Sequence, residues 1–220
     1  MSFSLGKMIQ MSISNNSLFI TFEGIDGCGK STQVKMLMDR LDGKNIESLL
    51  VREPGGTKIS EEIREVLLKN RNDTMAKRTE ALLMTASRAQ LTKEVIIPKL
   101  EAGTWVIADR FKDSTLAYQG GGRGLDLNYL IQLNEFATYE LDPDITFFID
   151  VTAKEGSGRR TSGKQDRIEG AGLKFQEKVR VQYLKLAHMF SHRFVIIDGT
   201  LTPDEIHKVI WNEIQKRKNS

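Results

Sequence analysis

The fold class is indicated by one stretch of the sequence, Gly24-Ile25-Asp26-Gly27-Cys28-Gly29-Lys30-Ser31-Thr32. An apolar run, 18–22, precedes it, and apolar residues at helical spacing follow it over 34–41. Glycines here let the backbone turn so that successive N–H groups point at a polyphosphate, and the positive end of the following helix adds to the same site. Strand, loop and helix all agree with G-x-x-x-x-G-K-[ST], so the stretch predicts a nucleoside triphosphate site rather than a plain glycine-rich turn.

Four residues are candidates for acting on the phosphates. Lys30 would reach the β- and γ-phosphates, and Ser31 would offer its hydroxyl to Mg²⁺. Asp109 and Arg110 follow the apolar run 105–108, where a carboxylate can hold Mg²⁺ or its waters and a guanidinium can bind a phosphate through two N–H groups. An Asp-Arg pair is usually just solvated, but beside a phosphate loop it becomes a candidate for phosphoryl transfer.

Length, charge and cysteine content narrow the class of protein. The chain has 220 residues, which suit a single domain, expected over 18–220, and a net charge of +3. That mild charge does not favour a nucleic-acid-binding protein, and no apolar run approaches the roughly 18 residues of a membrane span. The one cysteine, Cys28, suits a reducing cytosol. Residues 1–17 do not resemble a secretory signal, and we expect a disordered tail there.

Five apolar runs alternate with helical patterns. We expect strands over 18–22, 48–51, 105–108, 145–150 and 194–198. The helical patterns cover 34–41, 59–67, 79–100, 126–139, 173–190 and the segment from Pro203 onward. Pro98 should interrupt the third of these, and 112–124 reads as a short helix followed by a flexible glycine-rich loop. The alternation predicts an α/β protein with the P-loop NTPase fold, in which a five-stranded parallel sheet is covered by helices on both faces.

A second informative stretch, 154–170, is basic and rich in glycine. Its cations lie among small flexible residues between a strand and a helix, and they are Arg159, Arg160, Lys164 and Arg167. A lid that closes over a polyphosphate and supplies positive charge to the transition state needs this composition. Two plainer interpretations stay open: the segment is an ordinary solvated loop, or Arg167 forms a structural ion pair with Asp166.

A site for the phosphate acceptor should lie across from the phosphate loop. Arg64 and Arg88 are candidates on helices, and Ser114, Thr115 and Gln119 are candidates in a loop. Arg88 follows an apolar run and could equally be a helix residue whose charged end reaches solvent, so spacing alone leaves its role open.

Four blocks, in this order, make the chain resemble the thymidylate kinase family, whose members phosphorylate dTMP. The blocks are Phe22-Glu23-Gly24-Ile25-Asp26-Gly27-Cys28-Gly29-Lys30-Ser31-Thr32, Arg52-Glu53-Pro54-Gly55-Gly56-Thr57, Asp109-Arg110-Phe111 with Ser114-Thr115-Leu116-Ala117-Tyr118-Gln119-Gly120, and the basic segment that ends in Asp166-Arg167. The resemblance implies the reaction ATP + dTMP → ADP + dTDP with Mg²⁺, on the way to dTTP. It also implies a cytoplasmic homodimer.

The resemblance assigns residues to each substrate. ATP would bind to the whole loop, namely Gly24, Ile25, Asp26, Gly27, Cys28, Gly29, Lys30, Ser31 and Thr32. The acceptor dTMP would contact Asp26, Glu53, Arg64, Met84, Arg88, Arg110, Ser114, Thr115 and Gln119. Ser31 and Asp109 would serve the metal.

Individual roles follow from the same resemblance. Arg110 would hold the phosphate of dTMP, and Arg88 would hydrogen-bond the thymine. Thr115 and Gln119 would read the other edge of the base, and Glu53 would lie near the deoxyribose and the metal. The base would thus be recognised by groups from two separate segments of the chain.

Members of the family carry a catalytic arginine either in the phosphate loop or in the lid. Here 26–28 leave the loop without one, whereas the lid is basic, as in the bacterial type. The catalytic set implied by the resemblance is therefore Lys30, Asp26, Arg110 and one of the lid pair Arg159 and Arg160.

One position departs from the family pattern. An aromatic residue usually stacks on the thymine four positions before Arg88, and here that position holds Met84. A methionine can pack on a ring through its polarisable sulfur, but it would hold the base less rigidly.

Two other functions remain as alternatives. Another nucleoside monophosphate kinase or a deoxynucleoside kinase would share the phosphate loop and differ in the acceptor site. A nucleotide-dependent switch or binding module, such as a small GTPase, would need an Asn-Lys-x-Asp guanine-binding motif, which the sequence lacks. The basic lid also has no use in a simple switch.

Overall fold

Five β-strands form the centre of the molecule, as the apolar runs predict. The computed structural model describes residues 17–70, 75–159 and 166–218. Its strands are β1 Phe19–Glu23, β2 Ser48–Arg52, β3 Trp105–Asp109, β4 Ile145–Asp150 and β5 Phe194–Asp198. They pair in the order β2-β3-β1-β4-β5, and every pairing is parallel. The carboxyl ends of the strands therefore meet at one edge of the sheet.

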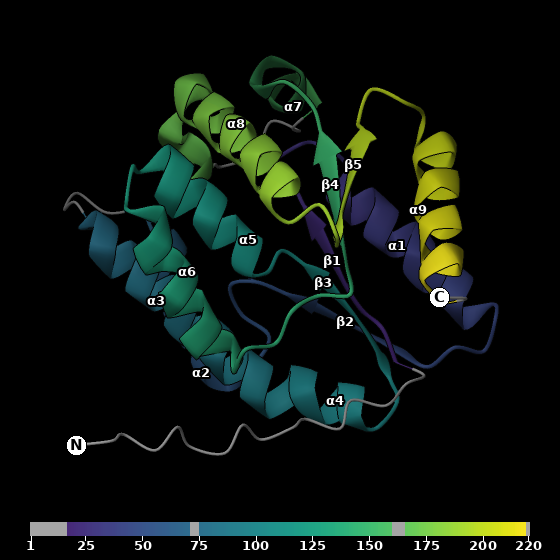
Figure 1. Ribbon diagram of the computed structural model, residues 1–220. Helices are drawn as coiled ribbons and strands as arrows, with labels where there is room; N and C mark the ends of the chain where they lie inside the picture. The colour runs from purple at the N-terminus through teal and green to yellow at the C-terminus, as the bar shows by residue number, and fades with distance from the viewer. Residues whose placement is uncertain (1–16, 71–74, 160–165, 219–220) are drawn as a thin grey trace.

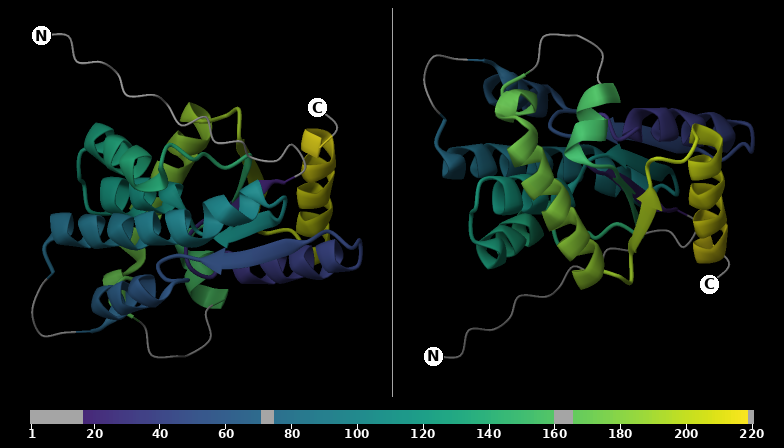
Figure 2. Two further views of the ribbon diagram at one scale, coloured as in Figure 1. Left: turned by 90° about the horizontal axis from the view of Figure 1, so that it is seen from below. Right: turned by 90° about the horizontal axis from the view of Figure 1, so that it is seen from above.

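Helices cover both faces of this sheet, which confirms the predicted fold class. They are α1 Lys30–Asp42, α2 Lys58–Leu68, α3 Lys77–Leu91, α4 Ile97–Glu101, α5 Lys112–Thr115, α6 Leu127–Thr138, α7 Ala153–Arg159, α8 Leu173–Met189 and α9 Pro203–Lys218. Figure 1 shows α1 and α9 on one side of the sheet and α3, α5, α6 and α8 on the other, and the views of Figure 2 show the same arrangement.

Apolar side chains fill the space between the sheet and its helices. The rings of Phe22 and Phe147, on neighbouring strands, have centroids 5.5 Å apart, and Leu37 of α1 is fully buried. Phe19 and Phe111 meet edge to face at 4.8 Å. Each such side chain contributes about 1.5–3 kcal/mol when it is fully buried, so the sheet provides a rigid base for the loops at its carboxyl edge.

The interruption expected at Pro98 takes the form of a widened helical turn rather than a break. α3 continues as a π-helix, η1, over Thr92–Ile96, and η1 leads directly into α4. Proline has no N–H to donate, and its ring collides with the carbonyl four residues earlier in a regular α-helix. A π-turn just before Pro98 changes that spacing, so the helical path can continue to Glu101.

The flexible loop expected after the short helix at 112 is instead ordered as a second π-helix, η2, over Leu116–Gly122. The reason is the close approach of α8. A Cβ added to Gly121 would lie 2.4 Å from Cβ of Gln182, and one added to Gly122 would lie 2.5 Å from the ring of Phe175. These glycines therefore let two helices pack at short range, a contact that local sequence cannot reveal.

Ser17 is the one residue of the expected N-terminal tail that the structure describes. Residues 1–16 of the expected tail fall outside the described residues. Ser17 is buried, and its hydroxyl donates to the carbonyl of Leu100 at 3.0 Å, so the expectation of disorder was wrong for Ser17. Across the described part of the chain, no helix is long and apolar enough to cross a membrane.

The packing of η2 against α8 generates a stability prediction. Gly121→Ala places a Cβ against the rigid Cβ of Gln182, so we expect the free energy of unfolding to fall by about 1–3 kcal/mol. The control is Gly158→Ala, because an added Cβ in that exposed turn of α7 meets no atom of the described residues within 4 Å. Urea denaturation followed by circular dichroism measures both. Equal stability of the two variants would contradict the packing argument.

Candidate active site

The phosphate loop connects β1 to α1 and packs against α7. Gly27 has φ of 82°, a conformation that side chains disfavour, and a Cβ there would lie 2.1 Å from the carbonyl oxygen of Gly156. In turn a Cβ on Gly156 would lie 2.7 Å from the carbonyl oxygen of Asp26. The start of the predicted lid is therefore a helix that lies directly on the loop, which corrects the expectation of a flexible segment from residue 154.

A cavity of about 650 Å³ opens in front of the loop. Seven of the nine predicted ATP residues line it, namely Asp26, Gly27, Cys28, Gly29, Lys30, Ser31 and Thr32. The other two, Gly24 and Ile25, lie behind the loop, where their carbonyl oxygens each accept a hydrogen bond from Nζ of Lys30 at 3.0 Å. The cavity also reaches residues after β5 that the sequence analysis missed, including Gly199 and Leu201. Their position at the carboxyl edge of a parallel sheet was the available signal.

A second cavity, of about 310 Å³, lies on the other side of Arg110. All nine predicted dTMP residues line it, namely Asp26, Glu53, Arg64, Met84, Arg88, Arg110, Ser114, Thr115 and Gln119. Among the described residues, four line both cavities, and they are Asp26, Ser31, Asp109 and Arg110. The lining of this acceptor cleft further includes Leu68, Asp166 and Ile168, which the sequence analysis did not assign to the site.

Arg110 stands at the boundary of the two cavities. It follows β3 with φ of 72°, an uncommon left-handed conformation for a residue with a side chain. Its guanidinium donates to the carbonyl oxygen of Gly24 at 3.0 Å and forms an ion pair with Asp26. Because the side chain is still 17% exposed, a permanent positive charge faces the space between the two cavities.

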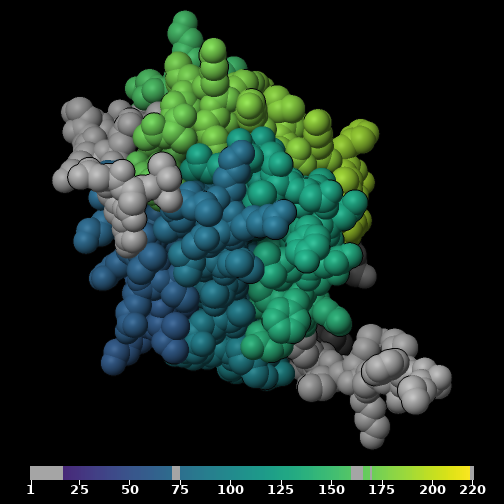
Figure 3. Space-filling model, turned by 90° about the vertical axis from the view of Figure 1, so that its left-hand side faces the viewer, coloured from purple at the N-terminus to yellow at the C-terminus, as the bar shows by residue number. Residues whose placement is uncertain are grey.

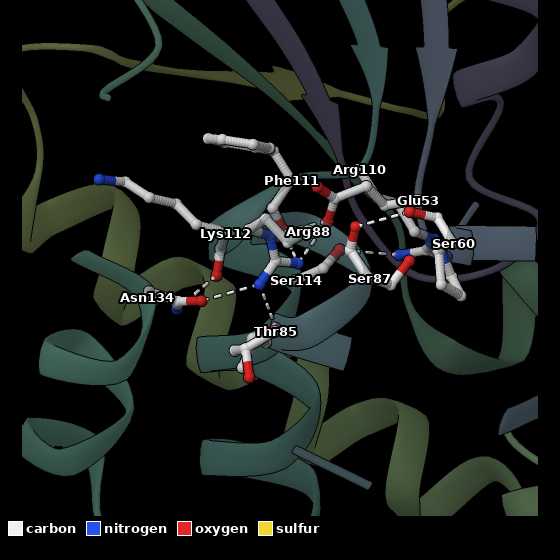
Figure 4. Close-up of polar contacts among 12 residues, drawn as sticks. Glu53, Ser60, Thr85, Ser87, Arg88, Arg110, Phe111, Lys112, Ser114 and Asn134 are labelled. Atoms are coloured by element: carbon white, nitrogen blue, oxygen red, sulfur yellow. Dashed lines mark hydrogen bonds and ion pairs between the residues drawn. The ribbon is translucent and has the colours of Figure 1, made fainter. Parts of the chain in front are cut away.

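Arg88 is buried in the wall of the acceptor cleft, so the interpretation as a solvent-reaching helix residue was wrong. Its side chain is 2% exposed, and Figure 4 shows it between Glu53 on one side and Asn134 on the other. All five of its N–H groups donate within the protein, to Glu53, Thr115, Asn134 and the carbonyl oxygen of Phe111. A hydrogen bond to a base would therefore need one of these donors to be shared.

Glu53 and Asp109 each keep one buried oxygen without a hydrogen-bond partner in the described part of the chain, Oε1 and Oδ1 respectively. The pKa of Glu53 lies above its usual value, because the effect of burial exceeds the opposing effect of the Arg88 charge. The other oxygen of Asp109 lies 3.5 Å from the hydroxyl of Ser31. Oxygen donors of this kind are the ligands that Mg²⁺ prefers, so the predicted metal residues fit the ion. No group of three or more His, Cys, Asp or Glu side chains that could hold a metal occurs in the described ranges.

Arg159 and Arg167, the two of the four lid cations that the structure describes, lie in different places. Arg159, at the end of α7, lines the cavity in front of the phosphate loop and donates to the carbonyl oxygen of Gly199 at 2.7 Å. Arg160 and Lys164 fall outside the described residues. Arg167 donates to the carbonyl oxygen of Leu67 at 2.9 Å and pairs with Glu80. The sequence left open that Arg167 forms a structural ion pair with Asp166; the structure shows such a pair, but with Glu80.

Glu23, the last residue of β1, is a buried carboxylate behind the acceptor cleft. It accepts hydrogen bonds from the backbone N–H of Phe111 at 2.8 Å and from the hydroxyls of Ser114 and Tyr183 at 2.6 Å each. Burial, together with the nearby charge of Asp113, raises its pKa to about 7. The sequence analysis quoted Glu23 in a motif but gave it no role.

The raised pKa of Glu23 predicts a pH-dependent stability. Between its ordinary pKa of 4.5 and about 7 the folded protein binds one more proton than the unfolded chain, so the free energy of unfolding falls as the pH rises through this range. We expect Glu23→Gln to remove on the order of 3 kcal/mol of that fall. Urea denaturation at several pH values from 5 to 8 tests this, with Glu62→Gln, an exposed position of α2, as the control. Parallel curves for Glu23→Gln and the wild type would contradict it.

Comparison with known proteins agrees with this geometry. The family model described as "Thymidylate kinase" matches residues 22–210. The chain is similar to a thymidylate kinase of Prosthecochloris aestuarii, 49% identical over 92% of this chain and 95% of that one. It is also similar to those of Caldanaerobacter subterraneus subsp. tengcongensis, 47% identical over 90% and 95%, and Thermosipho africanus, 48% identical over 92% and 100%. The chain belongs to the thymidylate kinase family.

Proposed function

We propose that the chain transfers the γ-phosphoryl group of ATP to dTMP, giving ADP and dTDP. The observation that carries the proposal is the meeting of two cavities at Asp26, Ser31, Asp109 and Arg110. A phosphoryl transfer needs a donor site and an acceptor site that share the space where the phosphoryl group moves. Membership of the thymidylate kinase family supports dTMP as the acceptor.

ATP binds in the cavity in front of the phosphate loop. The backbone N–H groups of 26–32 and the start of α1 hold the phosphates. Lys30 turns its ammonium group from the loop carbonyls toward the β- and γ-phosphates. Its buried position at the floor of the loop supports this role.

The acceptor dTMP binds in the second cavity with its phosphate toward Arg110. An oxygen of that phosphate attacks the γ-phosphorus of ATP, and the bond from the γ-phosphorus to the β–γ bridging oxygen breaks as ADP leaves. Arg110 faces both phosphates and stabilises the charge between them. Asp26 holds the guanidinium of Arg110 in place through their ion pair.

Ser31 and Asp109 are the residues that would hold Mg²⁺. Their facing oxygens, 3.5 Å apart, and Oδ1 of Asp109, which has no hydrogen-bond partner in the part of the chain that the structure describes, support this assignment. When bound, the ion neutralises phosphate charge. Since Mg²⁺ commonly takes only one or two protein carboxylates and completes its shell with phosphate oxygens and waters, one carboxylate beside the phosphate loop suffices.

Arg159 is the described lid cation that best supplies charge to the transition state, because it already lines the donor cavity. Arg160 stays the alternative. The thymine lies against Met84 and beside Arg88, Thr115 and Gln119, all of which line the acceptor cleft. Asp26 and Glu53 meet the sugar hydroxyl, a role supported by Oε1 of Glu53, which is buried and has no hydrogen-bond partner among the described residues.

The proposal is tested by measuring ADP formation from ATP and Mg²⁺ with dTMP, dUMP, dCMP, dGMP and AMP supplied separately. We expect a strong preference for dTMP, with dUMP second because it keeps the same hydrogen-bonding edge. Lys30→Ala is the control and should lower kcat by about 10²–10³-fold while the fold is retained. Preference for another monophosphate would indicate a different nucleoside monophosphate kinase. ATP binding without any turnover would favour a switch or binding module.

We further propose that the chain forms a homodimer through α3 and α6. The two helices pack side by side, and they leave Leu82, Tyr129 and Phe136 exposed by 57%, 75% and 84%. Figure 3 shows the face on which these helices lie. Large apolar side chains on one face are typical of an interface, and the resemblance to a dimeric family supports a second copy as the partner. The cytoplasmic location stays a prediction.

The dimer is tested by light scattering after size-exclusion chromatography. Phe136→Glu puts a charge into the proposed interface, so we expect it to convert a dimer of the wild type into a monomer. Met189→Glu, at an equally apolar exposed position on α8, is the control and should leave the dimer intact. A monomeric wild type, or a dimeric Phe136→Glu variant, would contradict the proposal.

A further inference from the structure

Glu80, in the first turn of α3, is a buried carboxylate for which the proposed reaction has no direct use. Its side chain is 2% exposed. Oε1 accepts hydrogen bonds from Nε2 of Gln119 and Nε of Arg123, each at 3.0 Å. Oε2 accepts from Nη2 of Arg123 at 3.0 Å and from Nη1 of Arg167. Two donors on each oxygen fill the acceptor positions of the group.

The ionised state of Glu80 determines how Gln119 must point. Burial raises the pKa of Glu80, but the hydrogen bonds from Arg123, Gln119 and Arg167 outweigh it, and the pKa lies below its usual value. An ionised carboxylate only accepts hydrogen bonds. The amide of Gln119 can therefore approach it only through its NH₂ group, which turns the amide oxygen away from Glu80.

Gln119 lines the acceptor cleft. Because its NH₂ group is held by Glu80, the amide oxygen is the end of the side chain that remains to meet a ligand there. The bond to Glu80 is the one hydrogen bond that its side chain makes within the described ranges. An acceptor recognises an N–H donor on the ligand. Thymine and uracil carry such a donor at ring position N3, whereas cytosine carries a bare nitrogen lone pair there.

Two arginines hold the carboxylate of Glu80 in this position. Arg123, just after η2, grips it with two N–H groups and lies over the ring of Phe175 at 4.5 Å. Arg167 reaches it from the end of the lid and is itself fixed to the carbonyl oxygen of Leu67. A carboxylate held from several sides cannot rotate to release the amide, so the orientation of Gln119 is built into the folded protein.

We propose that Glu80 is a positioning residue for base selection: it fixes the amide of Gln119 so that the oxygen meets N3–H of the pyrimidine and rejects cytosine. The inference rests on the proposed function, since it assumes a pyrimidine monophosphate in the acceptor cleft. Glu80 touches neither substrate and acts through Gln119.

The test compares kcat/KM for dTMP and dCMP in matched variants. In Glu80→Gln the neutral amide at position 80 can donate or accept a hydrogen bond, so the amide of Gln119 can adopt either orientation. We therefore expect the ratio of kcat/KM for dTMP to that for dCMP to fall by about tenfold or more. Arg123→Gln is the control. It removes two of the same four hydrogen bonds but leaves an acceptor-only carboxylate, so the ratio should stay near the wild-type value although the protein is less stable.

A double-mutant cycle shows whether Glu80 acts through Gln119. In a Gln119→Met background, Glu80→Gln should leave the dTMP-to-dCMP ratio unchanged, because no amide remains to be oriented. If Glu80→Gln does not fold, the pair Glu80→Gln with Arg123→Gln keeps the net charge, and its ratio is compared with that of Arg123→Gln alone.

Three results overturn the inference. The first is an unchanged ratio in Glu80→Gln, which would make Glu80 purely structural. The second is a fall of similar size in the dTMP-to-dCMP ratio of Arg123→Gln. The third is a further fall in that ratio when Glu80→Gln is added to Gln119→Met. Failure of the proposed function is recognised separately, because the wild type itself would then show no preference for dTMP.

Discussion

All strands of the sheet run in one direction, and this parallel pairing is the constraint on which the site depends. It brings together at one edge the loop after β1, Glu53 after β2, and Asp109 at the end of β3 with Arg110 next to it. These segments are far apart in the sequence, and only the register of the strands makes them neighbours. The donor and acceptor cavities meet there because β1 lies in the middle of the sheet.

Charged side chains gathered at one edge of the sheet lose contact with water, which costs free energy. Ion pairs and hydrogen bonds between these side chains and their neighbours offset that cost. Arg88 pairs with Glu53, Arg110 pairs with Asp26, and Lys30 bonds to loop carbonyls. Removing one partner from a fully buried pair such as Arg88–Glu53 usually costs about 3–5 kcal/mol, because a lone charge is left behind. The pairing is incomplete on the side of the cavities, where Oε1 of Glu53 and Oδ1 of Asp109 have no partner in the described ranges. The same network therefore stabilises the fold and leaves acceptors free for ligands.

The sequence was sufficient for features that depend on local spacing. The phosphate loop and the polar residues Glu53 and Asp109, which lie at the carboxyl ends of β2 and β3, are found at the sheet edge where the sequence predicted them. The residues that the family resemblance assigned to dTMP line one cavity, and their roles stay predictions. The sequence was insufficient where a role depends on a distant partner. Glu80 meets Gln119 across 39 residues and Arg167 across 87. Glu23 meets Tyr183 across 160.

The same physical limit explains the errors in local structure. Glycines at 121–122 were interpreted as a flexible loop because nothing nearby in the sequence reveals that α8 packs against them. Gly156 was likewise assigned to a flexible lid, although it lies against the phosphate loop. In both cases glycine marks a close approach of backbones rather than freedom of movement.

The central claim is that the two cavities form one continuous path for the phosphoryl group. Isothermal titration with a bisubstrate ligand, in which adenosine and thymidine are joined by a polyphosphate chain, tests it most directly. We predict one ligand per chain, with an affinity well above those of ATP and dTMP measured alone, because the second half binds at a high effective concentration. Affinity no better than that of ATP, or two ligands per chain, would show that the cavities do not work as one site and would contradict the account.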